Sequence, residues 1–332
     1  MIDAVFRPGS MSAGRGPASV ELLTRVASMY YLEDMTQETI ATNLGLSRPK
    51  IWRLLTQAKR AGIVEISVNL HPSLAVPVES EMTARFALSR TILVVDQGDE
   101  DHMRTRAGGA AVGVLDSTLR DGSIATIGMG RNARAVSFQA HGVRPRKATF
   151  ISAMGGAASI GDGLNSNDIA TRLAQAFGGS ALGIYAPAYA ESEQIRDSFL
   201  SNNDVRSTVA RARMADIAVV GIGDANDESL VVKLGLITTM DMARMREDGA
   251  VGDVLGSFFN AAGEPVASWI EDRVVGLTGA RDLRNIETVV AVAPEASKAE
   301  AILGALNSGI VHTLITSLSA ARRVIELADR AD

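Results

Sequence analysis

The sequence contains no cysteine. This absence excludes a disulfide scaffold, a zinc site built from thiolates and a cysteine nucleophile, and it agrees with a reducing compartment, so we expect a cytoplasmic protein. No run of 18 consecutive apolar residues occurs, which predicts no membrane span. Aromatic residues make up only 4% of the chain, whereas glycine is abundant at 31 residues. That balance is common in α/β proteins with many turns between strands and helices.

Catalytic signatures are also scarce. The four histidines are dispersed along the chain rather than grouped, which argues against a metal site. No nucleophile elbow, HExxH zinc motif or Walker motif occurs. We therefore expect no metal, no cofactor and no enzymatic activity. If the protein binds a small polar ligand, the lack of a recognisable acid–base pair favours a sensor over an enzyme.

Charge is distributed unevenly over the 332 residues. The whole chain has a formal net charge of −5, which argues against a protein that binds nucleic acid over its entire surface. Residues 1–70 alone carry a net +2, and the remainder carries −7. The window between Thr39 and Val64 has no acidic residue and five basic ones, Arg48, Lys50, Arg53, Lys59 and Arg60. Such a stripe is typical of a nucleic-acid-binding module, although a solvated helix face would carry the same charges.

The hydrophobic periodicity of the N-terminal part favours the first interpretation. Apolar residues at three- and four-residue spacing predict a helix over residues 20–30. Thr36 is expected to cap a second helix over 37–43, Gly45 to form a turn, and Ser47 to cap a third, basic helix. This is the layout of a helix-turn-helix, whose second helix enters the major groove of operator DNA. The predicted DNA-contacting residues are Gln37, Ser47, Arg48, Lys50, Trp52 and Arg53, although the indole at position 52 would equally pack against the preceding helix.

The segments around this motif set the expected domain boundaries. Residues 1–17 are rich in glycine and serine without an apolar core, so they predict a flexible tail rather than a signal peptide. Residues 62–68 alternate in polarity and predict a strand, a wing against the helices. We therefore expect a winged helix-turn-helix domain over residues 18–70, a linker over 71–90, and a second domain over 91–332.

The second domain repeats a strand–turn–helix pattern. Short buried apolar strands that alternate with helices predict an α/β fold with a doubly wound, largely parallel sheet covered on both faces. Ligands in such sheets bind beyond the carboxyl ends of the strands, at the topological switch point. The expected strands are residues 91–95, 123–127, 148–153, 181–185, 217–220, 289–292 and 311–315.

Three features of this domain suit a small polar ligand. The loop at residues 128–132, Gly-Met-Gly-Arg-Asn, opens a helix whose N–H groups suit an anion. It lacks the third glycine of the dinucleotide fingerprint, so a nicotinamide-dependent dehydrogenase is not expected. Asp253 could accept hydrogen bonds from sugar hydroxyls or simply cap a helix. Lys298 opens a helix and could pair with an anion or be solvated.

Motifs from both halves occur in a specific order. The N-terminal ones are Thr36-Gln37, Ile40-Ala41, Leu44-Gly45-Leu46-Ser47-Arg48, Arg53-Leu54-Leu55 and Gly62-Ile63-Val64. The C-terminal ones include Gly155-Gly156, Asn167, Ala186-Pro187-Ala188, Val219-Val220-Gly221-Ile222-Gly223, Gly249-Ala250-Val251-Gly252-Asp253 and Lys298. This combination resembles the SorC family of bacterial transcription regulators over roughly residues 20–328.

The resemblance implies a DNA-binding domain joined to a sugar-sensing domain that is similar to sugar-phosphate isomerases and deaminases but serves as a switch. It implies a tetramer that binds operator DNA and a sugar, polyol or sugar phosphate. An enzyme with an appended N-terminal domain is the alternative, and a ligand-free assembly protein is a third. Carried onto this chain, the effector-binding residues are Gly128, Gly130, Arg131, Asn132, Gly155, Gly156, Asn167, Gly221, Gly223, Asp253 and Lys298.

The sequence departs from the family at three places. The first loop usually reads Gly-Trp-Gly-Arg-Thr, whereas Met129 and Asn132 stand here. The usual glycine pair before the lysine is Pro294-Glu295, and the usual Thr-Asp near the end is Thr316-Ser317. Because an acidic residue replaces a glycine, a neutral sugar or polyol is an alternative to the phosphorylated effector.

Overall fold

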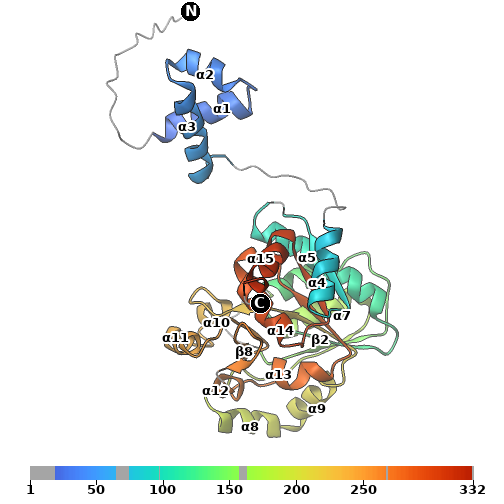
Figure 1. Cartoon of the computed structure of the whole chain (residues 1–332). Coiled ribbons are helices and arrows are strands. Elements are labelled where there is room, and N and C mark those ends of the chain that lie inside the picture. Colours follow the sequence, from blue (N-terminus) through green and yellow to red (C-terminus); the bar gives the residue numbers. More distant parts are fainter. Residues whose placement is uncertain (1–18, 65–74, 97, 157–162, 267, 331–332) are drawn as a thin grey trace, which may run out of the picture. The chain divides into compact units, whose positions relative to one another are not determined.

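The chain divides into two compact units, residues 1–68 and residues 69–332 (Figure 1). The computed structural model describes residues 19–64, 75–96, 98–156, 163–266 and 268–330. The predicted tail over residues 1–17 lies outside the described residues, as do residues 65–68 of the predicted wing strand.

The smaller unit contains the three predicted helices, α1 (Val20–Tyr31), α2 (Gln37–Leu44) and α3 (Arg48–Arg60). They pack around a core of their own, in which Val26, Ile40 and Ile51 are fully buried. The Thr36 hydroxyl accepts a hydrogen bond from the Thr39 N–H at 3.2 Å, which caps α2 as predicted. Gly45 adopts the left-handed conformation with φ +62° and ends α2, so the turn of the helix-turn-helix forms where the sequence placed it.

The structure differs in part from two local predictions in this unit. Ser47 holds the N-cap position of α3, but its hydroxyl makes no capping hydrogen bond. Residues 62–64, the described part of the predicted wing strand, form a turn and a bend rather than the beginning of a strand. Hydrogen bonds from the Ile63 and Val64 N–H groups to the Ala58 carbonyl fold this segment back onto the end of α3, which satisfies backbone donors without a strand partner.

The larger unit is built on a seven-stranded parallel sheet within the described residues, in the order β1-β11-β10-β5-β2-β3-β4. The strands are β1 (Arg90–Val94), β2 (Ile124–Ile127), β3 (Thr149–Ser152), β4 (Ser180–Leu182), β5 (Ile217–Gly221), β10 (Thr288–Val292) and β11 (Thr313–Ser317). All seven overlap the predicted apolar segments, because a strand buried on both faces reads as a continuous apolar run.

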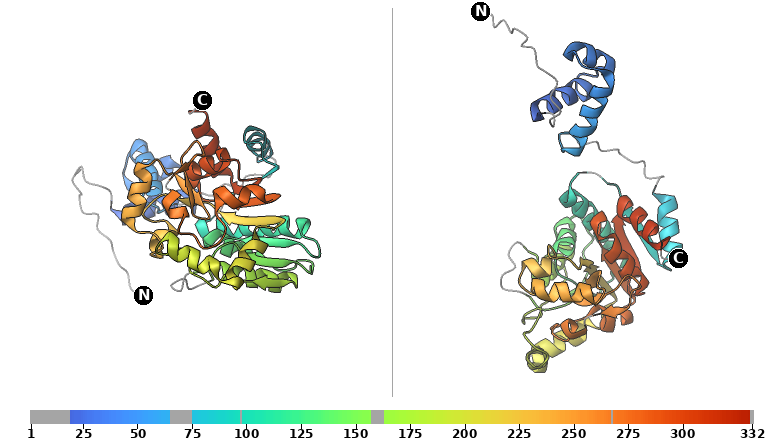
Figure 2. Two further views of the ribbon diagram at one scale, coloured as in Figure 1. Left: turned by 90° about the horizontal axis from the view of Figure 1, so that it is seen from below. Right: turned by 60° about the vertical axis from the view of Figure 1, so that its left-hand side comes forward.

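Helices cover both faces of this sheet (Figures 1 and 2). Side chains alternate along each strand, so Ile217 and Val219 pack on one side, whereas Ala218 and Val220 pack on the other. The first side holds α5 (Glu100–Thr118), α6 (Arg131–Gln139) and α7 (Ser166–Phe177). The second holds α4 (Val76–Arg85), α9 (Asn203–Ala212), α14 (Ala299–Asn307) and α15 (Leu318–Ala328).

The strand order creates one topological switch point. The chain runs outward through β2, β3 and β4, then returns to place β5 on the opposite side of β2. The loops that follow β2 and β5 therefore leave the sheet side by side, and a crevice opens between them at the carboxyl edge. The backbone joins the two strand ends there, because the Gly128 N–H donates to the Val219 carbonyl at 2.9 Å.

A small antiparallel sheet, absent from the sequence prediction, follows β5. It has the order β6-β7-β8-β9. Its short strands are β6 (Gly223–Asp224), β7 (Gly252–Val254), β8 (Ser257–Phe259) and β9 (Pro265–Val266). The remaining helices are α8 (Glu193–Ser201), α10 (Leu230–Lys233), α11 (Thr239–Glu247), α12 (Ser268–Glu271), α13 (Gly279–Asp282) and the 3-10 turns η2 (Leu283–Asn285) and η3 (Ala296–Lys298).

The assignment of residues 71–90 to a linker needs a correction. Helix α4 lies in this range and belongs to the larger unit. Its Met82 is fully buried, and its Glu79 carboxylate accepts the Leu93 N–H of β1 at 2.8 Å. This helix could not be recognised from the sequence, because its apolar positions are few and Pro77 in its first turn resembles linker composition.

Candidate functional site

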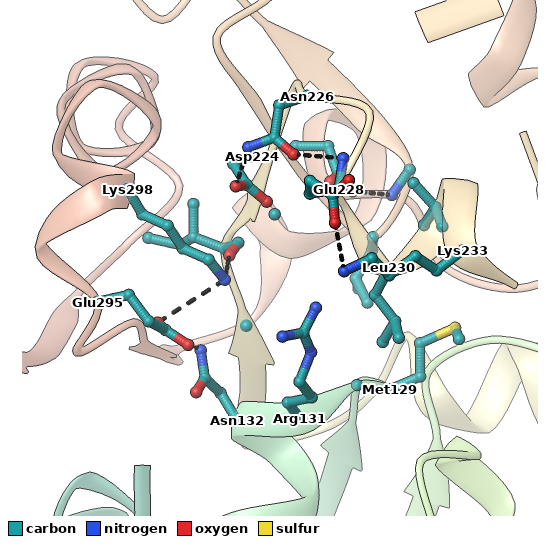
Figure 3. Close-up of a pocket in the computed structure, with 18 of the residues that line it drawn as sticks. Met129, Arg131, Asn132, Asp224, Asn226, Glu228, Leu230, Lys233, Glu295 and Lys298 are labelled. Atoms are coloured by element: carbon teal, nitrogen blue, oxygen red, sulfur yellow. Dashed lines mark hydrogen bonds and ion pairs between the residues drawn. The ribbon is translucent and has the colours of Figure 1, made fainter. Parts of the chain in front are cut away.

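A cavity of about 330 Å³ lies at the switch point, between the ends of β2 and β5 and the small sheet (Figure 3). Side chains from α5, α6, α10, β6, β7 and η3 line it. Seven of the eleven predicted effector-binding residues meet here, namely Gly130, Arg131, Asn132, Gly221, Gly223, Asp253 and Lys298. Most of the residues chosen from the motifs therefore lie at the crevice expected from the fold class.

Four predicted residues do not line the cavity: Gly128, Gly155, Gly156 and Asn167. The Asn167 side chain instead joins α7 to the sheet edge, accepting the Ile184 N–H at 3.0 Å and donating to the Ile184 carbonyl at 3.2 Å. A side chain at Gly155 would place its Cβ 2.3 Å from the Ala186 carbonyl oxygen. These residues hold loops together, so their place in the motifs reflects packing at this edge.

The Glu295 carboxylate lines the cavity, although it was not among the predicted effector-binding residues. Glu295 is only 4% exposed. Its Oε1 accepts from Arg104 Nε at 2.8 Å and its Oε2 from Asn132 Nδ2 at 3.1 Å, and Lys298 Nζ lies 3.7 Å from Oε2. Burial by itself would raise the pKa of Glu295, but the charges of Lys298 and Arg104 and the Asn132 hydrogen bond lower it below its ordinary value. The carboxylate is therefore ionised at neutral pH.

Asp253 also lines the cavity and lies in β7. It is not a helix cap, the alternative that the sequence left open. Its Oδ2 accepts the Gly256 N–H at 3.0 Å. Burial raises the pKa of Asp253 to about 6, the Gly256 hydrogen bond and Lys298 oppose the shift, and the charge of Asp224 adds to it. A buried carboxylate with one oxygen free of protein partners among the described residues is a strong acceptor for a ligand hydroxyl.

A further part of the cavity lining comes from β6, α10 and the segment between them. Asp224 accepts a hydrogen bond from Asn226, and Lys233 pairs with Glu228 at 2.7 Å. Arg131, the first residue of α6, extends toward the centre of the cavity and has no hydrogen-bond or ion-pair partner among the described residues (Figure 3). The cavity thus presents several hydrogen-bond acceptors and a single unpaired cation to a ligand.

Gly223 permits the close approach of strand β6 to Asp253. A Cβ on Gly223 would lie 2.0 Å from Asp253 Oδ1, a distance that no side chain tolerates. We expect Gly223→Ala to displace the carboxylate, to destabilise the protein by about 1–3 kcal/mol and to weaken ligand binding. Urea unfolding checks the stability.

The matched control is Gly109→Ala in the middle of α5, where a Cβ meets nothing within 4 Å. This change should stabilise the protein by about 0.5–1 kcal/mol, because alanine favours a helix. Equal unfolding free energies for the two variants would contradict the close approach at Gly223.

The predicted DNA-contacting residues lie at the start of α2 and in α3. Ser47, Arg48, Lys50 and Arg53 are exposed, and Gln37 is half-buried. The Trp52 side chain is 59% exposed, so it does not pack against the preceding helix. The fully buried Ile51 and the neighbouring Leu54 and Leu55 form the opposite face of α3. The basic residues are therefore free to contact another molecule.

The described residues contain no helix that is long and apolar enough to cross a membrane. Nor do they contain a group of three or more histidine and acidic side chains that could hold a metal ion.

Known proteins are similar to this chain both in its larger unit and over nearly its whole length. The Sugar-bind family model, which describes a sugar-binding domain, matches residues 71–326. The transcriptional regulator LsrR of Enterobacter sp. (strain 638) is 30% identical over 99% of this chain and all of its own length. The erythritol catabolism regulatory protein EryD of Brucella abortus (strain 2308) is 28% identical over 93% of this chain and 97% of its own.

Two solved structures share the fold. The sugar-binding domain of a transcriptional repressor from Vibrio fischeri superposes with a TM-score of 0.71 and is 36% identical, covering 76% of this chain and 99% of its own. The full-length sorbitol operon regulator SorC from Klebsiella pneumoniae has a TM-score of 0.70 at 21% identity, covering 92% of this chain and 99% of its own. The second likeness extends over most of the chain and concerns the fold alone.

A helical unit with an exposed basic helix, joined to an α/β domain with a polar cavity, defines a ligand-responsive transcription regulator. The chain belongs to the SorC family of sugar-binding transcription regulators. It is a sugar-responsive regulator and not an enzyme.

Proposed function

We propose that a small polyhydroxylated effector binds in the cavity between β2 and β5 and controls the affinity of α3 for operator DNA. The observation that carries this proposal is the buried Asp253 carboxylate facing a polar cavity at the switch point. The effector must bind one arrangement of the protein more tightly than another, because only a difference in affinity shifts the equilibrium.

The proposed contacts follow from the acceptors and donors in the cavity. Effector hydroxyls donate hydrogen bonds to the carboxylates of Asp253 and Asp224. Asn226 and Arg131 donate hydrogen bonds to other oxygen atoms of the effector. The name of the relative EryD refers to catabolism of erythritol, a small polyol, and a cavity of about 330 Å³ is at the small end of ligand pockets. Both support an effector of a few carbon atoms.

On the DNA side, we propose that α3 lies in the major groove, with Arg48, Lys50, Trp52 and Arg53 near the bases and Gln37 and Ser47 near the phosphates. An even number of subunits, a tetramer by the family resemblance, would match an operator with two half-sites. Such a role places the protein in the cytoplasm.

The decisive experiment uses the full chain and its operator at fixed salt, with and without each member of a panel of sugars, polyols and their phosphates. We expect one class of compound to change operator affinity and to raise the melting temperature of the protein. Absence of sequence-preferring DNA binding with every compound would overturn the proposal.

The pKa of Asp253 predicts how effector binding depends on pH. The groups that face this carboxylate are Lys298, Asp224 and Tyr189. Hydroxyl donors favour the ionised form, so affinity is complete above the pKa of about 6 and is lost as the pH falls through it. At pH 5 we expect affinity for an uncharged effector to be about tenfold lower than at pH 7.5. Isothermal titration calorimetry at pH 5 and pH 7.5 measures the effector affinity. Equal affinities at the two pH values would contradict the assignment of Asp253 as an effector-binding residue.

A further inference from the structure

Three of the four basic side chains of the cavity are already engaged by the protein itself. Four basic side chains line it, Arg104, Arg131, Lys233 and Lys298. Arg104 pairs with Glu295 and also with Glu100 and Asp101. Lys298 donates to the Ile222 carbonyl at 2.9 Å and faces Glu295, and Lys233 pairs with Glu228. Among the described residues that line the cavity, Arg131 alone has no such partner, so its charge is available to a ligand.

Glu295 is the centre of this arrangement. Its two oxygens receive contacts from α5 and α6, whose Arg104 and Asn132 lie 191 and 163 positions away in the chain, and from η3, which follows Glu295 directly. Its side chain is almost completely buried. A carboxylate held by two cations and an amide resembles, in charge and hydrogen bonding, a bound anion that the protein supplies itself.

A second anion at this end of the cavity would meet the Glu295 carboxylate in a region shielded from water. Like charges at such distances repel strongly where water is excluded. The nearby carboxylates of Asp224, Asp253 and Glu228 add to the negative potential. A phosphate dianion also carries no hydrogen-bond donor for these acceptors, whereas each hydroxyl of a polyol carries one.

We propose that Glu295 is a built-in anion that determines specificity, so that the effector of this protein is an uncharged polyol or sugar and phosphate monoesters are excluded. This inference rests on the proposed function, because it names the chemical class that the same cavity accepts. Glu295 is thus a positioning residue for the cations and a selectivity residue for the effector.

The test compares matched ligand pairs on two variants and the unmodified protein. The probes are tetritols, pentitols and hexitols, the corresponding sugars, the phosphate monoester of each, and inorganic phosphate. Glu295→Gln keeps the size and one acceptor of the side chain but removes its charge. Glu300→Gln, an exposed position on α14 outside the cavity, is the control with the same change in net charge.

We expect the unmodified protein to be stabilised by a neutral member of the panel and not by its phosphate or by inorganic phosphate. In Glu295→Gln, inorganic phosphate should bind about tenfold more tightly than in Glu300→Gln, since Arg104 and Lys298 become available. Titration calorimetry and melting curves measure both effects, and the melting curve of each variant without ligand reports folding.

Two results would overturn the inference, and they have different consequences for the proposed function. A phosphate monoester that binds the unmodified protein more tightly than its neutral parent refutes the assignment of the effector class while the proposed function stands. If no compound in the panel stabilises the protein or changes operator affinity, the proposed function fails and the inference fails with it.

Discussion

The variant Asp253→Asn is expected to lose the effector response and to be more stable than the unmodified protein at neutral pH. The carboxyl group has a pKa of about 6 in the folded state, against an ordinary value of 3.8. The folded state therefore binds more protons than the unfolded state between these values, and stability falls as the pH rises from about 4 to 6. Above that range the ionised group costs roughly 3 kcal/mol.

Asparagine avoids this cost because it does not ionise, and its amide oxygen can still accept the Gly256 N–H. Its oxygen is a weaker acceptor for an effector hydroxyl, since hydrogen bonds to a charged group are roughly twice as strong as neutral ones. We expect effector affinity to fall about 10–100-fold, together with a higher melting temperature at pH 7.5. At pH 5 the difference in stability between the two proteins should be smaller.

Melting curves at pH 5 and 7.5, together with effector titrations, measure these changes. Asp248→Asn, an exposed aspartate after α11 and outside the cavity, is the control and should change neither quantity. A variant Asp253→Asn with unchanged effector affinity would show that the ligand binds elsewhere.

The parallel sheet could be predicted from the sequence because its strands are short apolar runs followed by glycine turns. Ile217–Gly221 and Thr288–Val292 are buried on both faces, and only such positions require apolar residues without alternation. The rule that ligands bind at a switch point then placed the cavity beside Gly130 and Gly221. The helix-turn-helix could also be predicted from the sequence, since Thr36 and Gly45 mark the ends of α2.

The features that were missed depend on contacts over long distances in the chain. Arg104 and Glu295 are separated by 191 positions, so neither could be assigned to the cavity before the sheet order was known. The strands β6 and β9 have two residues each, which is too short for any periodicity. Conversely, Asn167 and Gly155 were predicted as ligand contacts from the motifs, although their contacts here are with the backbone of neighbouring loops.

Glu295 illustrates how the two sources of information combine. The sequence showed an acidic residue where the family usually has glycine, and this raised the alternative of a neutral effector. The structure adds the partners, namely two cations and an amide that surround the carboxylate. A charge that would be unfavourable in isolation is therefore stable here, and its presence changes what else the cavity can bind.

Replacing Arg48 or Arg53 by alanine is expected to weaken operator binding strongly without unfolding the smaller unit. Both side chains are exposed, and the apolar face of α3 that holds the unit together carries Ile51 and Leu54 instead. A bidentate arginine contact to a base is worth about 1–3 kcal/mol. In an assembly that engages two half-sites, the loss occurs twice, so affinity should fall roughly 30-fold or more.

The matched control is Lys59→Ala, near the other end of the same helix, where the ammonium lies 5.9 Å from the Tyr31 ring centroid. It removes the same charge far from the end of α3 that would enter the groove, so its effect on affinity should be smaller. Binding measured over a range of salt concentrations separates the contacts. Loss of a phosphate contact reduces the salt slope by about one unit, whereas loss of a base contact relaxes sequence preference at one position.

The charge distribution along the chain explains why the basic residues of α3 should dominate operator affinity. The larger part of the chain carries a net −7 and the first 70 residues a net +2, so the acidic domain repels the phosphates that the basic helix attracts. Removing one arginine halves the net positive charge of the DNA-binding part. If operator affinity in Arg48→Ala and Arg53→Ala equals that of Lys59→Ala, then α3 does not read the operator and the DNA contact lies on another surface.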